Sequence, residues 1–215
     1  MEEKDEIIEY GQCEIEGIQV VTIIGEIEGH DCLSQNAKST KYEHLLPQLA
    51  QWEADKECRG ILFLVNTVGG DVSCGLALAE MISSMSKPTV ALVIGDSHSI
   101  GVPLAVAADY TFIVPTATVI IHPVRMSGTV LGAPQTYKEF HLIQDRIVGF
   151  IASHSHASKE KVEQLMMNTR MMAKDLGTLL VGEEAVEAGI VDSIGGLKDA
   201  FAKLSAYCNK EKREV

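Results

Sequence analysis

Apolar residues recur along the chain in two patterns that predict alternating strands and helices. Short runs rich in Val, Ile and Leu are typical of buried strands and occur at residues 18–24, 60–65, 89–94, 110–114, 118–121 and 190–192. Apolar residues at helical spacing predict helices over residues 40–54, 73–85, 104–108, 137–152, 159–168, 182–188 and 197–207. This alternation favours βαβ units and a largely parallel sheet covered by helices.

The remaining segments predict how the chain divides. Residues 1–17 are expected to form a flexible N-terminal segment, and residues 209–215 a charged, disordered tail. Residues 18–208 contain no linker or repeat, so they are expected to form a single domain. Residues 123–134 are rich in Gly, Ser and Pro and are expected to form a loop.

The turn at residues 94–103 lies between a predicted strand and a predicted helix, and it contains Ser99. Such a turn exposes a serine hydroxyl, and the helix start offers backbone N–H groups to an anion. Serine is also a common N-cap, and without a base nearby the cap is the favoured interpretation. A nucleophilic Ser99 therefore requires a base and an oxyanion site.

A second turn, at residues 66–71, has the same layout and contains Gly69 and Gly70. Two glycines permit positive φ angles and a close approach of the backbone to a ligand. The N–H groups of Gly70 and Ile100 are candidate oxyanion donors. A plain tight turn remains an equally good interpretation of these glycines.

His122 is the strongest candidate base. It follows the strand at 118–121 directly, and α/β proteins place functional groups at the carboxyl ends of strands. A half-buried histidine without chemistry is the alternative. His98 adjoins Ser99, but neighbouring side chains on a turn diverge. The other histidines have weaker positions: His30, His44, His141, His154 and His156.

The net charge limits the classes of partner, and the cysteine content indicates the cellular compartment. The formal net charge of −12 over 215 residues argues against nucleic acid or an anionic membrane as the main partner. Five cysteines without a CxxC pair indicate a reduced, cytoplasmic protein. No signal peptide and no transmembrane segment are expected. No cluster has zinc-ligand spacing, so no metal or other cofactor is expected.

Four segments in this order resemble the ClpP-class serine peptidases: Asn66–Gly70, Ser99–Gly101, Ile120–Pro123 and Glu184–Ser193. The whole pattern is similar to a divergent subgroup of that family, the translocation-enhancing proteins (TepA). The resemblance runs from about Val20 to Gly195. It implies an α/β fold of the ClpP/crotonase type, with stacked ββα units and a protruding handle helix.

The resemblance also implies residue roles. Ser99 would be the nucleophile of a serine-type endopeptidase, His122 the general base, and the N–H groups of Gly70 and Ile100 the oxyanion hole. The third triad member matches less well. An ungapped comparison places it at Gly177, and a shift of two residues places it at Asp175. A solvent-facing aspartate or a helix cap is the alternative for Asp175.

The substrates implied by the resemblance are peptides or unfolded proteins, cut inside homo-oligomeric rings, with a link to pre-protein export or quality control. Docking of an AAA+ unfoldase stays open, because the loop before the handle is more Gly-rich here than in the family. Two alternative functions remain. One is a catalytically inactive ClpP-like scaffold or binding protein. The other is an acyl-CoA enzyme of the crotonase type, which the Ser99–His122 pair disfavours.

Overall fold

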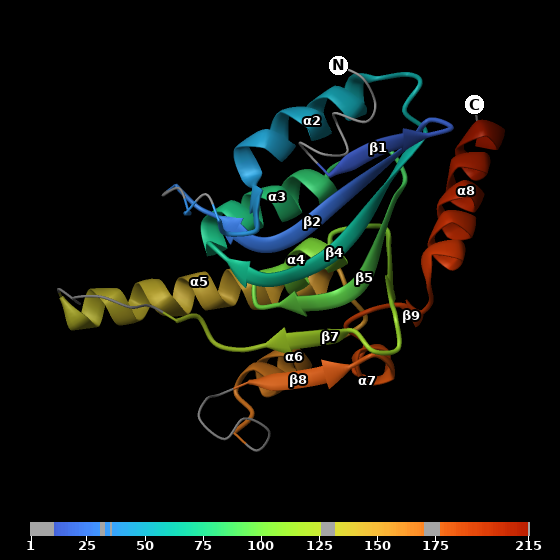
Figure 1. Cartoon of the computed structure of the whole chain (residues 1–215). Helices are drawn as coiled ribbons and strands as arrows, with labels where there is room; N and C mark the ends of the chain where they lie inside the picture. The colour runs from blue at the N-terminus through green and yellow to red at the C-terminus, as the bar shows by residue number, and fades with distance from the viewer. Residues whose placement is uncertain (1–10, 31–32, 35, 126–131, 170–176, 215) are drawn as a thin grey trace.

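A computed structural model describes residues 11–30, 33–34, 36–125, 132–169 and 177–214 (Figure 1). Strands and helices alternate along most of the chain. In order they are β1 (Gln12–Ile15), β2 (Ile18–Glu28), β3 (Ser39–Lys41), α2 (Tyr42–Ala54), β4 (Gly60–Gly70), α3 (Val72–Ser83), β5 (Thr89–His98), α4 (Gly101–Val106), β6 (Tyr110–Ile113), β7 (Thr118–Ile121), α5 (Ala133–Ser153), α6 (Lys159–Met166), β8 (Thr178–Val181), α7 (Glu183–Glu187), β9 (Ser193–Ile194) and α8 (Leu197–Glu214).

The described strands form one nine-stranded sheet whose main order is β1-β2-β4-β5-β6-β9. The pairs β2–β4, β4–β5, β5–β6, β5–β7 and β6–β9 are all parallel. Only β1 and β8 pair antiparallel within this part of the chain. The fold is thus the mixed α/β fold that the sequence predicts. The carboxyl ends of β4, β5 and β7 lie at one edge of the sheet (Figure 1).

Strand β5 has two successive partners on one side. Its first part, Val90–Val93, pairs with β6, and its last part, Asp96–His98, pairs with β7. Strands β6 and β7 follow one another closely in the chain. This fork brings the residues after β5 next to the residues after β7, because parallel strands end at the same edge.

The two faces of the sheet bury different cores. In β4, Ile61, Phe63 and Val65 pack with α2 to α6, whereas the alternate residues Leu62 and Leu64 belong to the core under α8. Such alternation follows from the two-residue period of a strand. Figure 1 shows α8 apart from the other helices. It also shows the first part of α5 projecting beyond the strand ends, as expected for a handle helix.

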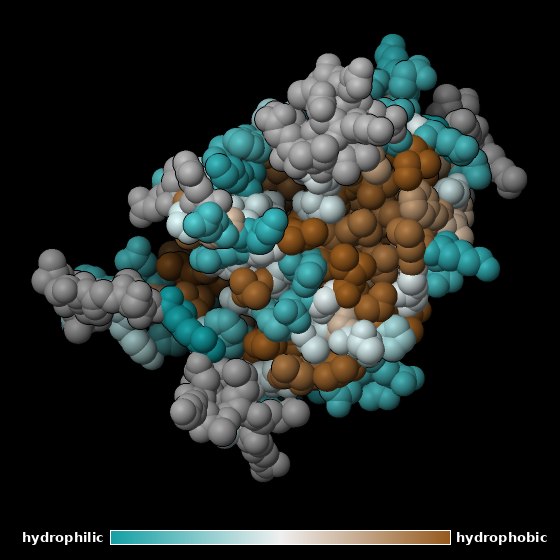
Figure 2. Space-filling view, in the orientation of Figure 1, coloured by the Kyte–Doolittle hydropathy of each residue, from teal (hydrophilic) through white to brown (hydrophobic). Residues whose placement is uncertain are grey.

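The sheet face that carries α8 is covered only in part. Figure 2 shows hydrophobic residues gathered over β2, β4 and β5 on this face. Val68 of β4 is 59% exposed and Ile94 of β5 is 41% exposed.

Among the described residues, no helix is both long enough and apolar enough to cross a membrane.

The structure departs from the sequence expectations in its edge strands. Strands β1, β3 and β8 have only three or four residues each, too few to show a clear period of their own. β1 lies within the segment expected to be flexible, and α8 continues to Glu214, into the expected tail. The strand expected at 190–192 lies instead at Ser193–Ile194, where it pairs with β6. The turn expected at 66–71 is strand as far as Gly70.

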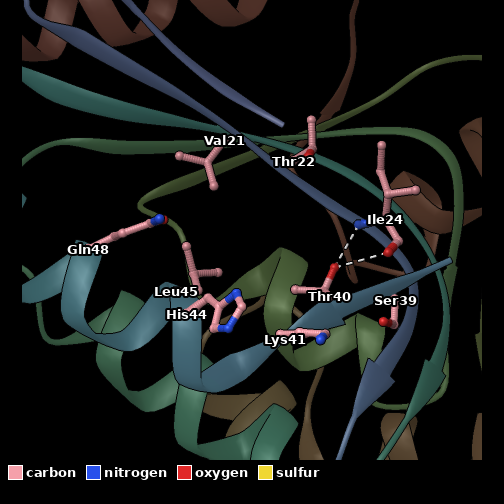
Figure 3. A pocket seen from close by; sticks show the side chains of 9 residues that line it. All are labelled: Val21, Thr22, Ile24, Ser39, Thr40, Lys41, His44, Leu45 and Gln48. Atoms are coloured by element: carbon pink, nitrogen blue, oxygen red, sulfur yellow. Dashed lines mark hydrogen bonds between the residues drawn. The ribbon is translucent and has the colours of Figure 1, made fainter. Parts of the chain in front are cut away.

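A side-chain hydroxyl closes the open edge of β2 between β1 and β3. β1 covers residues 18–21 of β2, and β3 covers residues 26–28. At Ile24, between them, the Thr40 hydroxyl accepts from the backbone N–H at 2.9 Å and donates to the carbonyl at 3.0 Å. Figure 3 shows both bonds in a cavity of about 290 Å³ between β2, β3 and α2. Thr40 thus replaces a strand partner.

Replacing Thr40 by valine keeps the side-chain shape and removes both hydrogen bonds. We expect T40V to lower the free energy of unfolding by about 0.5–1.5 kcal/mol, because a partly buried backbone N–H group loses its acceptor. The T40S variant keeps the hydroxyl and should recover most of the loss. Urea denaturation followed by circular dichroism measures both. Equal stability of T40V and wild type would show that water replaces the hydroxyl.

Candidate active site

Ser99 lies in a strained turn between β5 and α4. Its φ angle is +57°, a value that is uncommon for residues other than glycine. The turn is held by Ser99 N–H donating to the Ile120 carbonyl at 2.8 Å and by Val102 N–H donating to the Ser99 carbonyl at 3.1 Å. The N-cap of α4 is Ile100, and no side chain caps this helix. The helix-cap interpretation of Ser99 is therefore wrong. Ser99 is half-buried at the turn between the strand and the helix.

The end of β4 lies directly against Ser99. Gly69 has a φ angle of +93°, and a Cβ atom added there would lie 2.8 Å from the Cβ of Ser99. Gly70 has a φ angle of +151°, and its added Cβ would collide with the backbone of Ile27. Both positions thus require glycine for conformation and for space. The close approach brings the Gly70 backbone to the rim of the pocket beside Ser99.

His122 follows β7 immediately, and its ring has a defined tautomer. The Nδ1 atom lies 2.7 Å from the Pro123 carbonyl oxygen. A carbonyl can only accept, so Nδ1 carries the proton and donates. This leaves Nε2 of the neutral ring with its lone pair, which is the form that a general base requires.

One pocket joins the residues that the sequence singled out. Its volume is about 170 Å³, and Gly70, Ser99 and His122 all line it. Arg125 also reaches it, and the remaining lining is apolar: Val72, Ile121, Val124, Ile147, Ile151 and Met166. Ile100 follows Ser99 directly, with its side chain buried in the core. The sequence analysis missed the apolar wall, although Ile147 and Ile151 have the i, i+4 spacing of one helix face.

Asp175 lies outside the described residues, which resume two positions later at Gly177. Strand β8 pairs antiparallel with β7, and Ile121 lies opposite Thr178. A Cβ atom added to Gly177 would lie 2.8 Å from the Cβ of His122. The N–H of Gly177 donates to the Asn168 carbonyl at 2.8 Å. The described chain therefore enters β8 at Gly177, beside His122.

A polar cluster lies beside the site, on the strands that carry Ser99 and His122. The Thr118 hydroxyl donates to Asp96 Oδ1 at 2.8 Å, and His98 Nε2 lies 2.8 Å from the same hydroxyl oxygen. Burial lowers the pKa of His98, as does the nearby His122 ring, while Asp96 opposes both effects. His98 therefore favours the neutral form near neutral pH. The sequence analysis had set His98 aside on its position alone.

Cys74 is a possible competing nucleophile, because it lies in the first turn of α3, close to Gly70. Burial raises the pKa of its thiol to about 11, and Asp71 adds to the rise. Because the thiolate is the reactive form, this thiol is inert near neutral pH. Within the part of the chain that the structure describes, no group of three or more His, Cys, Asp or Glu side chains is placed to hold a metal ion.

Comparisons with known proteins identify relatives of this chain. The profile of the Clp protease family matches residues 16–198. The chain is 48% identical to the translocation-enhancing protein TepA of Halalkalibacterium halodurans over 201 residues, which cover 94% of this chain and 78% of that protein.

More distant relatives are named as protease subunits. The chain is 28% identical over 140 residues to the ATP-dependent Clp protease proteolytic subunit 1 of Chlamydia muridarum, covering 62% of this chain and 69% of that protein. It is 29% identical over 157 residues to the ATP-dependent Clp protease proteolytic subunit of Streptococcus pneumoniae, covering 70% and 76%. With a family match over most of its length and a mixed α/β fold around the Ser99 turn, the chain belongs to the Clp protease family.

Proposed function

We propose that this protein is a serine endopeptidase that cleaves peptides or unfolded protein chains. The observation that carries the proposal is the single pocket lined by Ser99, His122 and Gly70. The strained Ser99 turn and the Nε2 lone pair of His122 support it. A scaffold without chemistry would need neither a strained serine nor an oriented imidazole at that point.

The reaction follows from the positions of these groups. Ser99 Oγ attacks the carbonyl carbon of the peptide bond, and His122 Nε2 takes the hydroxyl proton. The N–H groups of Gly70 and Ile100 hold the oxyanion of the tetrahedral intermediate. His122 then gives the proton to the leaving amine, the C–N bond breaks, and water hydrolyses the acyl-enzyme by the same route.

We assign the third triad position to Asp175. Gly177, two positions after Asp175, lies against His122. Two residues of extended chain span only about 7 Å. A carboxylate there would accept a hydrogen bond from Nδ1, which in this structure donates to the Pro123 carbonyl. It would also stabilise the imidazolium that forms during attack, which a neutral carbonyl does less well.

The pocket beside Ser99 indicates the substrate side chain. Its volume of about 170 Å³ is roughly five or six water volumes. This is room for one medium-sized side chain, and most of the lining is apolar. We expect leucine or methionine at the residue whose carbonyl is attacked.

The projecting helix α5 supports assembly into homo-oligomeric rings. Tyr137 is 66% exposed and Leu142 is 63% exposed on this helix. Large apolar side chains in contact with water are typical of surfaces that bind a partner. A second copy of the chain is the partner we expect there, as the family resemblance implies.

Removing the Ser99 hydroxyl tests the proposed function. A fluorophosphonate probe should label the wild type at Ser99 only, and S99A should remain unlabelled. S99A should also lower the hydrolysis of a fluorogenic leucyl peptide by at least about 10³-fold. S73A, which changes an exposed serine of α3, is the matched control and should retain the wild-type rate. A wild type that neither reacts nor cleaves would favour a non-catalytic scaffold.

Replacing Asp175 by asparagine tests its assignment separately. We expect D175N to lower kcat by about 10³- to 10⁴-fold, because the imidazolium loses its counter-charge. KM should change little, since Asp175 does not contact the substrate. Steady-state kinetics over pH 6–9 gives both constants. A loss of less than tenfold would assign the orientation of His122 to the Pro123 carbonyl alone.

The pocket predicts a ranking of substrates. Peptides with leucine at the cleaved bond should show a kcat/KM at least tenfold above those with alanine, because the larger side chain fills the apolar wall. Peptides with glutamate there should be cleaved more slowly than either. A preference for glutamate would mean that Arg125, and not the apolar wall, sets the specificity.

A further inference from the structure

Ser99 and His122 depend on a very short stretch of sheet for their separation. Strands β5 and β7 share only three residue pairs: Asp96 with Thr118, Ser97 with Val119, and His98 with Ile120. One further bond, from Ser99 N–H to the Ile120 carbonyl, follows. Ser99 is the residue directly after the last paired residue of β5. His122 directly follows Ile121, the last residue of β7. Any slip or opening of the pairing therefore moves the nucleophile relative to the base.

Side chains join the same two strands on one face. Asp96 and His98 of β5 alternate onto the face shared with Thr118 of β7, as the two-residue period requires. The Thr118 hydroxyl has a single proton, and it uses this proton to donate a hydrogen bond to Asp96. His98 Nε2 must then donate to the hydroxyl oxygen at 2.8 Å. Nε2 also lies 3.4 Å from Asp96 Oδ1, so the three groups form one clamp.

The His98 ring of the clamp is largely buried, and it interacts electrostatically with the His122 ring. The His98 side chain is 18% exposed, whereas Asp96 is 44% exposed. The described charged or titratable groups known to act on His98 are Asp96 of β5 and His122 after β7. Both His98 and His122 can become cations, so a charge on either ring opposes a charge on the other. A neutral His98 can donate to Thr118 without placing a positive charge beside the general base.

We propose that His98 is a positioning residue, which with Thr118 and Asp96 fixes the distance between Ser99 and His122. The inference rests on the proposed peptidase function, and it adds three residues that do not contact the substrate. Such an effect can be large, since misplacement of reacting groups by about 1 Å can cost roughly 10²-fold in rate.

Two substitutions break the clamp from opposite strands. H98A removes the imidazole donor, and T118V removes the hydroxyl while keeping the side-chain shape. Each should lower kcat and the rate of fluorophosphonate labelling by about 10- to 100-fold, with KM within about twofold. The double variant should lose no more than the more affected single variant, because both changes break the same link. Additive losses would overturn the proposal.

Conservative variants and a matched pair separate positioning from plain stability. H98Q keeps an N–H donor and T118S keeps the hydroxyl, so both should restore most of the rate. H156A removes a second histidine–aspartate contact, His156 to Asp192 at 2.9 Å, on a different part of the chain, and should label at the wild-type rate. Positioning slows labelling without lowering the final labelled fraction. A lower final fraction, or a wild-type rate in H98A, would overturn the proposal.

The clamp can be judged even if the wild type has no peptidase activity. The imidazole nitrogen spectrum of histidine-labelled protein should show a protonated Nε2 on His98 at neutral pH. T118V should change the His98 signal and shift the His122 signals as well, because the two strands separate. Inactivity of the wild type would refute the proposed function alone. Unchanged His122 signals in T118V would refute the clamp.

Discussion

The pairing of β5 with β7 is the constraint on which the site depends. It is parallel, so both strands end at the same edge, and the residues that follow them meet there. Ser99 leaves β5 in a left-handed conformation and is bonded back to Ile120 of β7. His122 comes directly after β7. Ser99 and His122 are therefore held by one local piece of sheet, although 22 residues of sequence lie between them.

The glycines around this pairing allow the other strands to approach it. Gly69 lets the end of β4 lie against Ser99, and Gly177 lets the chain before β8 lie against His122. A Cβ atom added at either glycine would lie 2.8 Å from the Cβ atom of Ser99 or His122, so the backbone would have to shift. Helices α5 and α6 then supply the apolar side of the pocket. The strand ends thus position the polar groups, and these helices provide part of the apolar lining. A mostly apolar lining with a few placed polar groups is typical of ligand sites.

Several elements explain why sequence reasoning reached the site but not all of its surroundings. Ser99, His122 and Gly70 lie at the carboxyl ends of strands with clear apolar patterns, so their positions there could be predicted. Strands β1, β3 and β8 form by pairing with a neighbour, and segments of three or four residues are too short to give a periodic signal. The helix-cap interpretation of Ser99 failed because Ser99 has a left-handed φ angle and Ile100 holds the N-cap position, which residue types alone leave open.

The sequence by itself determined the α/β class, the order of the main strands and helices, and the family to which the chain belongs, because these depend on local periodicity and on ordered motifs. Only the tertiary structure decided that β5 forks between β6 and β7, and that Thr118 joins Asp96 and His98. It also decided which face of α5 closes the pocket. These features arise from contacts between segments far apart in the chain, and no local pattern of residues encodes such a contact.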